Sequence, residues 1–228
     1  MFVGHIGAGL VVKRFEPRLN LGALLFAALF SDLLLWVLVI FGVESVRIPE
    51  ATGSAQSFSF VLPYSHGLVS SILWSVLGGF AGLRFVAPQA SRRSKLAWAL
   101  ALTVFSHFAL DLIVHIPDLP VFGQESFKLG LGLWRHMPIA LALELLFAAV
   151  ALVVSLRSAR LSRVRGFIVG GIVLVAAAFT AAGPYLPGEV PPPVVLALSS
   201  LITLIVVVLL GFVVEGRVGA MAVRRVAA

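Results

Sequence analysis

Six long apolar stretches, each long enough to cross a bilayer as a helix, constrain the fold of this chain more than any other feature. A hydrocarbon core of about 30 Å requires about 20 predominantly apolar residues. The chain is 60% hydrophobic and only 12% charged, which leaves too little polar surface for a soluble domain. The sequence therefore predicts an all-α, polytopic membrane helical bundle with about six transmembrane helices. These stretches are 19–42, 66–87, 96–116, 137–156, 166–184 and 194–214.

The ionisable residues divide this single membrane domain, residues 1–228, into two parts. All five histidines lie in the first 136 residues, and the last two apolar stretches contain no histidine or acidic residue in their interiors. Such groups cost about 3 kcal/mol each at membrane depth, so they usually face a cavity and carry function. We therefore expect 1–156 to bear the site and 157–228 to form a two-helix packing part. Two longer polar segments, 43–65 and 117–135, would roof the site.

Basic residues are distributed unequally between the two sets of loops. Thirteen of them flank the apolar stretches on one side, and only three lie in the loops of the other side. By the positive-inside rule the richer side is cytoplasmic. We therefore expect a multi-pass protein of the bacterial inner (plasma) membrane with both termini cytoplasmic. The basic residues occur in short clusters without interleaved aromatics, which argues against nucleic acid as a partner.

Residues 1–12 form a shorter apolar segment before the first basic pair, Lys13 and Arg14. About twelve helical residues rise only about 18 Å, too little to cross a membrane. Since the basic pair would hold the end of this segment at the cytoplasmic surface, a half-helix dipping into the membrane would bring His5 near the midplane. The alternative is an interfacial helix that lies flat on the membrane.

The third apolar stretch carries three titratable residues at helical spacing, His107, Asp111 and His115. Spacings of four and eight residues place them on one helix face. Two ligands at positions i and i+4 can bind the same metal, as in other helical metal sites. The alternative is an aspartate that only hydrogen-bonds a histidine inside the bundle.

Residues from three other segments reach a similar depth and favour a metal. Asp32 lies near the middle of the first stretch, His66 opens the second at its outer end, and the half-helix would contribute His5. The chain has no cysteine, which leaves histidine and carboxylate as the only good ligands. This ligand set suits a divalent metal such as Zn, with Mn or Fe also possible. The predicted metal ligands are His5, Asp32, His66, His107, Asp111 and His115.

Three residues at the edge of this cluster have alternative roles. His115 could be a ligand, a hydrogen-bond partner of a ligand or an exposed capping residue. Glu144, about eight residues into the fourth stretch, could be a general base or a partner for a serine or a backbone group. His136 follows Trp134 in a predicted interfacial belt, and we expect no role for it in the site. The candidate catalytic residues are Asp111 and Glu144.

Four short motifs in this order resemble a known family. They are Gly4-His5, Ser31-Asp32, Pro63-Tyr64-Ser65-His66 and Ser106-His107-x-x-x-Asp111. Together they resemble the YdjM-like family of bacterial membrane-bound metal-dependent hydrolases, over about residues 2–140. The segments 114–120 and 130–134 look like a subgroup often labelled permease. The resemblance implies a multi-helix membrane fold with His5, Asp32, His66, His107 and Asp111 as the polar site.

Three functions fit these features. The first is a metal-dependent hydrolase of a membrane lipid or a lipid-linked ester or phosphoester, with a metal-activated water as nucleophile. Asp111 or Glu144 would then move protons. The second is a transporter or permease that uses the histidines and aspartates to couple cations or protons, since half-helices are a device of transporters. The third is a membrane scaffold with a structural metal.

Overall fold

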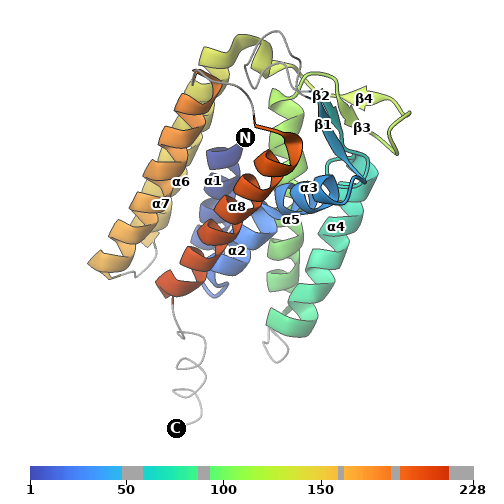
Figure 1. Cartoon of the computed structure of the whole chain (residues 1–228). Helices are drawn as coiled ribbons and strands as arrows, with labels where there is room; N and C mark the ends of the chain where they lie inside the picture. Colours follow the sequence, from blue (N-terminus) through green and yellow to red (C-terminus); the bar gives the residue numbers. More distant parts are fainter. Residues whose placement is uncertain (48–58, 87–92, 159–161, 186–190, 216–228) are drawn as a thin grey trace.

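The computed structural model describes residues 1–47, 59–86, 93–158, 162–185 and 191–215, and over these residues the chain is a helical bundle (Figure 1). Two small antiparallel ribbons lie at one end of the bundle. The α-helices are α1 (Phe2–Phe15), α2 (Leu21–Ala28), α3 (Phe30–Ile40), α4 (Leu68–Ala81), α5 (Arg93–Val114), α6 (Met137–Ser158), α7 (Arg163–Ala182) and α8 (Pro193–Glu215). The shorter elements are β1 (Ser45–Arg47), β2 (Ser59–Val61), the π-helical turn η2 (Gly82–Val86), β3 (Leu119–Pro120), β4 (Lys128–Leu129) and the 3-10 turns η3 (Leu133–His136) and η4 (Gly183–Tyr185).

The all-α class is confirmed, but the expected number of spans is too high. In the described part of the chain, α5, α6, α7 and α8 are long and apolar enough to cross a membrane. The pair α2 and α3 would make a fifth span if it counts as one broken helix. Four such helices, or up to five, indicate a membrane protein with fewer than six spans.

Two of the predicted spans differ from a continuous helix for local reasons. The stretch 19–42 is broken at Leu29 (φ −99°, ψ 5°), where the chain bends by 56° between α2 and α3. The stretch 66–87 begins in a turn, so its helix α4 starts only at Leu68 and changes to π-helical hydrogen bonding at Gly82. Apolar length alone reveals neither the bend nor the change of helix type.

Helix α1 is enclosed by the bundle and does not lie flat on its surface. Residues from Val3 to Leu10 are buried, including His5, and α1 packs against α6 and α2. Figure 1 shows its N-terminus between the other helices, well inside the two ends of the bundle. A buried helix of 14 residues that starts among other helices fits the half-helix expectation.

The two polar segments expected as a roof form the ribbons above the end of α5 (Figure 1). One ribbon pairs β1 with β2, and the other pairs β3 with β4. The second segment also closes the end of α5, because the Leu131 N–H donates to the Leu112 carbonyl at 2.8 Å and the Gly132 N–H to the His115 carbonyl at 2.7 Å. Gly130 (φ 146°) makes this possible, since a Cβ there would lie 2.3 Å from the Ile116 carbonyl oxygen.

A buried ion pair joins the C-terminal ends of helices α1 and α8. The Lys13 ammonium lies 2.5 Å from Glu215 Oε1 and also donates to the Leu19 carbonyl at 2.7 Å. The second Glu215 oxygen accepts the Leu21 N–H at 2.9 Å. Helix α8 is therefore attached to both α1 and α2 at the end of the bundle that lies opposite the ribbons.

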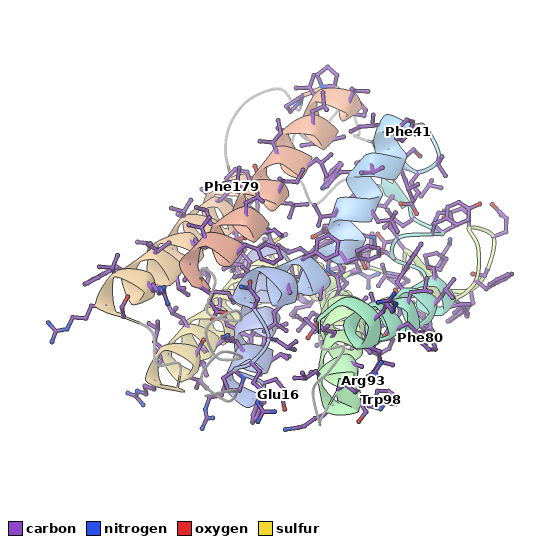
Figure 2. All side chains as sticks on the ribbon, turned by 90° about the horizontal axis from the view of Figure 1, so that it is seen from below. Glu16, Phe41, Phe80, Arg93, Trp98 and Phe179 are labelled. Carbon is purple, nitrogen blue, oxygen red and sulfur yellow. The ribbon has the colours of Figure 1, made fainter. Side chains whose placement is uncertain are left out.

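The outside of the bundle is apolar. In Figure 2, which looks along the bundle from below, large side chains such as Phe41, Phe80, Trp98 and Phe179 point outward. Between 63% and 76% of each of these four side chains is exposed. Exposed aromatic and aliphatic groups on this scale are expected where lipid, and not water, surrounds the helices.

Candidate metal centre

The break between α2 and α3 provides two groups for a polar centre. Asp32 falls in the first turn of α3, where a carboxylate is favoured by the helix N-terminus. The carbonyl of Ala28, at the end of α2, accepts a hydrogen bond from His107 Nδ1 at 2.8 Å. The same bend that shortens the first span therefore places an acidic side chain and a backbone acceptor at one point inside the bundle.

His107 and Asp111 lie on the buried face of α5, as their spacing predicts. The exposed fractions of their side chains are 1% and 2%, and His107 Nε2 lies 3.2 Å from Asp111 Oδ2. Because a carbonyl only accepts, the Ala28 contact requires the proton on Nδ1 of His107. The lone pair of Nε2 in the neutral ring then points into the cluster.

His66 reaches the cluster from the turn before α4. Its Nδ1 contacts Ser65 Oγ at 2.7 Å, and its Nε2 lies 3.2 Å from His107 Nε2. The same Nε2 is 3.5 Å from Asp32 Oδ1 and 3.6 Å from Asp111 Oδ2. Two imidazole nitrogens and two carboxylates therefore converge on one small volume.

His5 adds a third imidazole from α1. Its ring stacks on that of His107, with 3.7 Å between centroids and 10° between planes, and its Nε2 lies 3.2 Å from Asp111 Oδ1. That contact lacks hydrogen-bond geometry, so both His5 nitrogens and Asp111 Oδ1 are buried without a hydrogen-bond partner among the described residues. Orphaned polar atoms of this kind are costly inside a protein and indicate a missing partner.

The five residues fit a divalent cation. Two groups offer ligand atoms that lie within 4.8 Å of one another: His5 with Asp32 and His107, and His66 with His107 and Asp111. A cation between them would supply the partner that the facing acceptors lack. The combination of imidazole and carboxylate is typical of Zn, Mn and Fe sites. The structure thus brings together five of the six predicted ligands.

The sixth, His115, lies at the edge of the cluster toward the ribbons. Its Nε2 is 4.0 Å from Asp111 Oδ2, and its Nδ1 lies 2.9 Å from Asp118 Oδ1. Its ring packs on Trp134 at 4.2 Å between centroids. His115 belongs to neither group of candidate ligands. These contacts favour the hydrogen-bonding alternative, and a direct ligand role stays a prediction.

Glu144 is buried on α6 and binds the backbone of α1. Its Oε1 accepts the Gly4 N–H at 3.0 Å, next to His5. A carboxylate at the first turn of a helix is favoured by the helix dipole and by the unpaired N–H groups there. This contact matches the alternative in which Glu144 is the partner of a backbone group. It also holds the first turn of α1, which carries His5. A proton-transfer role for Glu144 stays a prediction.

Sequence reasoning missed a supporting carboxylate, Glu44. Its Oε1 accepts the N–H groups of Tyr64 and Ser65 at 2.8 and 2.9 Å, which fixes the turn that carries His66. Glu44 is only 2% exposed although it lies in a segment that reads as a polar loop. Nothing local in the sequence distinguishes it from a solvent-exposed loop residue. The role of Ser65 could have been found from the sequence, because Ser65 directly precedes the candidate ligand His66.

Comparison of the chain with protein-family models, curated proteins and solved structures finds no match. The resemblance to the YdjM-like family therefore stays a prediction from four short motifs. The case for a site rests on the convergence of side chains from α1, α3, α5 and the turn before α4.

Proposed function

We propose that this protein is a membrane-embedded metal-dependent hydrolase that acts on a lipid or lipid-linked ester or phosphoester. The observation that carries the proposal is the meeting of three imidazoles and two carboxylates inside an apolar bundle, with some of their atoms unpaired. Structural packing alone would satisfy such groups with donors, as the ammonium of Lys13 satisfies Glu215. Here Asp111 Oδ1 lies 3.6 Å from the Met1 ammonium but, like both His5 nitrogens, has no hydrogen-bond partner among the described residues, and a bound cation would supply one.

His5, Asp32, His66, His107 and Asp111 would hold the metal, which when bound activates a water and polarises a carbonyl or phosphoryl oxygen. His107 is fixed by its bond to the Ala28 carbonyl, and His66 by its contact with Ser65. Such outer partners orient the imidazoles and keep the correct nitrogen free. The chain itself therefore preorganises the ligands.

Asp32 differs from its neighbours in exposure, which supports a catalytic over a purely structural site. Its side chain is 22% exposed, whereas those of His5, His66, His107 and Asp111 are between 1% and 4% exposed. A structural site is closed, and a catalytic site keeps an open position. The side of Asp32 is where water and substrate would enter, and Asp111 or Glu144 would move protons.

The membrane context favours a lipid substrate. Counting from Leu96, the first apolar residue of α5, Asp111 lies about 22 Å along the helix, in the outer half of a hydrocarbon core of about 30 Å. By the positive-inside rule the basic ends of α1, α5 and α8 would face the cytoplasm, so this level would belong to the outer half of the bacterial inner membrane. The expectation of a cytoplasmic N-terminus does not fit α1, because the Met1 ammonium lies inside the bundle, 3.6 Å from Asp111 Oδ1. Ester and phosphoester groups of lipids lie at this level.

A transporter or permease that couples cations or protons is the second candidate. Its support is the short helix α1 and the broken pair α2 and α3, which end near the same polar cluster. Discontinuous helices with ends at an ion site are characteristic of secondary transporters. In that reading His66, His107 and Asp111 would bind a cation or relay protons without breaking a bond.

The test is hydrolysis by the full chain in vesicles that contain phospholipids and a polyprenyl diphosphate. We expect release of a water-soluble product that stops on chelation and returns when Zn or Mn is added. Asp111→Asn should reduce the rate to background, while the exposed His136→Ala should retain it. A cation or proton flux in sealed vesicles, lost in Asp111→Asn without any hydrolysis, would establish the transporter and refute the hydrolase.

A further inference from the structure

A cavity of about 370 Å³ lies beside the candidate metal centre, toward the basic end of the bundle. Its walls come from α2, α4, α5, α8 and the first residues of α3 and η2. All its lining residues are apolar side chains or glycine, apart from the ring nitrogen of Trp74. Its volume is within the range of ligand pockets, about 300 to 1,000 Å³. The larger residues of the wall are Phe26, Phe30, Trp74, Leu77, Leu100 and Phe212.

Three wall residues of this cavity are close to candidate ligands, either along the chain or through one hydrogen bond. Phe30, the first residue of α3, lies two residues before Asp32. Val104 lies three residues before His107 on α5, slightly less than one helical turn. The indole N–H of Trp74 donates to the Tyr64 carbonyl at 2.8 Å, in the turn that carries His66. None of the five candidate ligands lines the cavity itself, but three of its wall elements, α3, α4 and α5, carry or contact the segments that hold Asp32, His66 and His107.

The cavity also has the depth of lipid acyl chains. Along α5, Leu100 and Val104 lie about 10 and 16 Å from its first residue, whereas His107 and Asp111 lie about 21 and 27 Å from it. At α5 the cavity thus lies in the hydrocarbon core, between the basic end of the bundle and the polar centre. This is the order of groups in a lipid whose head lies in the outer leaflet.

The cavity opens to the lipid side of the bundle. Two of its wall residues, Phe26 and Leu77, are 47% and 46% exposed. On one side of the cavity Gly78 of α4 and Gly82 of η2 approach α5 closely, so that a Cβ on Gly82 would lie 2.7 Å from Leu100 Cδ1. A chain could enter sideways from the membrane without crossing a polar surface.

From these observations we infer that this cavity, the acyl groove, binds one acyl chain of the substrate lipid and places its ester or phosphoester at the metal centre. The inference deepens the proposed function and rests on it for the identity of the reacting group. An acyl chain is the occupant because the groove offers almost no hydrogen-bonding group, lies at the depth of acyl chains and shares its wall elements with the candidate ligands. A polar ligand would leave its donors and acceptors unsatisfied there.

The test uses the full chain in phosphatidylglycerol vesicles that contain phosphatidylethanolamine with a diazirine near the end of one acyl chain. After irradiation, the adducts are located by proteolysis and mass spectrometry. We expect them to concentrate on Leu77 and Val104 over the exposed Phe179 of α7. Ala81→Phe and Ala23→Phe, which place a ring in the groove, should reduce groove labelling about tenfold, since each buried methylene contributes about fourfold in affinity.

Ala178→Phe is the matched control, because Ala178 is exposed on α7 and lies outside the groove. It should leave groove labelling unchanged, and all variants should elute as monodisperse protein. Equal labelling of Phe179 and the groove, or a groove-lining crosslink to a second copy of the chain in place of lipid, overturns the inference. Groove labelling in Asp111→Asn separates the two proposals. Labelling at the wild-type level in this variant supports the groove even if no hydrolysis is found. Loss of groove labelling in this variant contradicts a groove that is formed by the fold alone.

Discussion

The two parts of this bundle differ in the length of their helices and in the polar groups that these helices carry inside the bundle. Helices α7 and α8 run for 20 and 23 residues without a break, and between Phe167 and Val214 their described residues include no charged side chain or histidine. Helices α1, α2 and α3 have only 14, 8 and 11 residues, and their ends lie near His5, Ala28 and Asp32. Continuous helices satisfy their own backbone and need no polar partner, whereas helix ends inside a bundle supply and require polar groups.

The difference shows where the polar groups of a membrane protein can be placed. In α8 the hydroxyls of Ser199 and Thr203 donate to carbonyls of their own helix at 3.0 and 2.9 Å. In the site-bearing part, His107 binds a carbonyl of another helix, and Glu144 of α6 binds the N-terminus of α1. Breaks in the helices are therefore part of how the candidate site is built.

The largest expected effect compares two buried carboxylates. Asp111 lies within 4.0 Å of four histidines and 3.6 Å from the Met1 ammonium, whereas Glu215 is paired, among the described residues, with Lys13 alone. Asp111→Asn should weaken Zn binding by at least about 100-fold, the upper end of what outer partners contribute. Glu215→Gln should leave it unchanged. Titration of both purified variants with a fluorescent Zn competitor measures this, and equal affinities would remove the distinction between the two carboxylates.

The next effect concerns stability. Lys13→Met leaves Glu215 buried without its cation, which costs about 3 kcal/mol when one partner of a buried pair is removed. The free energy of unfolding in detergent should fall by this amount, with metal content retained. The double variant Lys13→Met/Glu215→Leu should recover part of the loss. A double variant as unstable as the sum of the two single changes would argue against their coupling.

A smaller effect is expected from Ser65→Ala. The change removes the contact between Ser65 Oγ and His66 Nδ1, and outer partners of this kind contribute about 10-fold to metal affinity. The metal should still bind, more weakly, and the thermal midpoint of the metal-free protein should stay close to that of the wild type. If metal affinity is unaffected, His66 is oriented by the Glu44-bound turn alone.

The smallest effect is expected in the packing part. Thr203→Val removes only a hydroxyl that binds its own helix. The free energy of unfolding should change by less than about 0.5 kcal/mol, as for other exposed positions, and metal affinity should not change. A loss of metal binding in this variant would mean that α8 contributes to the site, and the division into a site-bearing part and a packing part would be wrong.

The helical membrane class and five of the residues at the polar centre follow from the sequence, since apolar length and intramembrane charge are strong signals. The spacing of His107 and Asp111 alone fixes their common face. The bend at Leu29 could not be predicted, because no proline or glycine marks it. Burial of Glu44 was equally hidden, because it depends on the tertiary position of the turn before α4 and on no local pattern.

Metal content tests the central claim most directly. Elemental analysis of the purified protein should find one or two equivalents of Zn, Mn or Fe in the wild type and in His136→Ala, and almost none in His107→Ala or His5→Ala. His136 is exposed and outside the cluster, so it controls for the loss of a histidine as such. If the wild type holds no divalent metal even after reloading, or if all three histidine variants retain it equally, the polar cluster is not a metal centre.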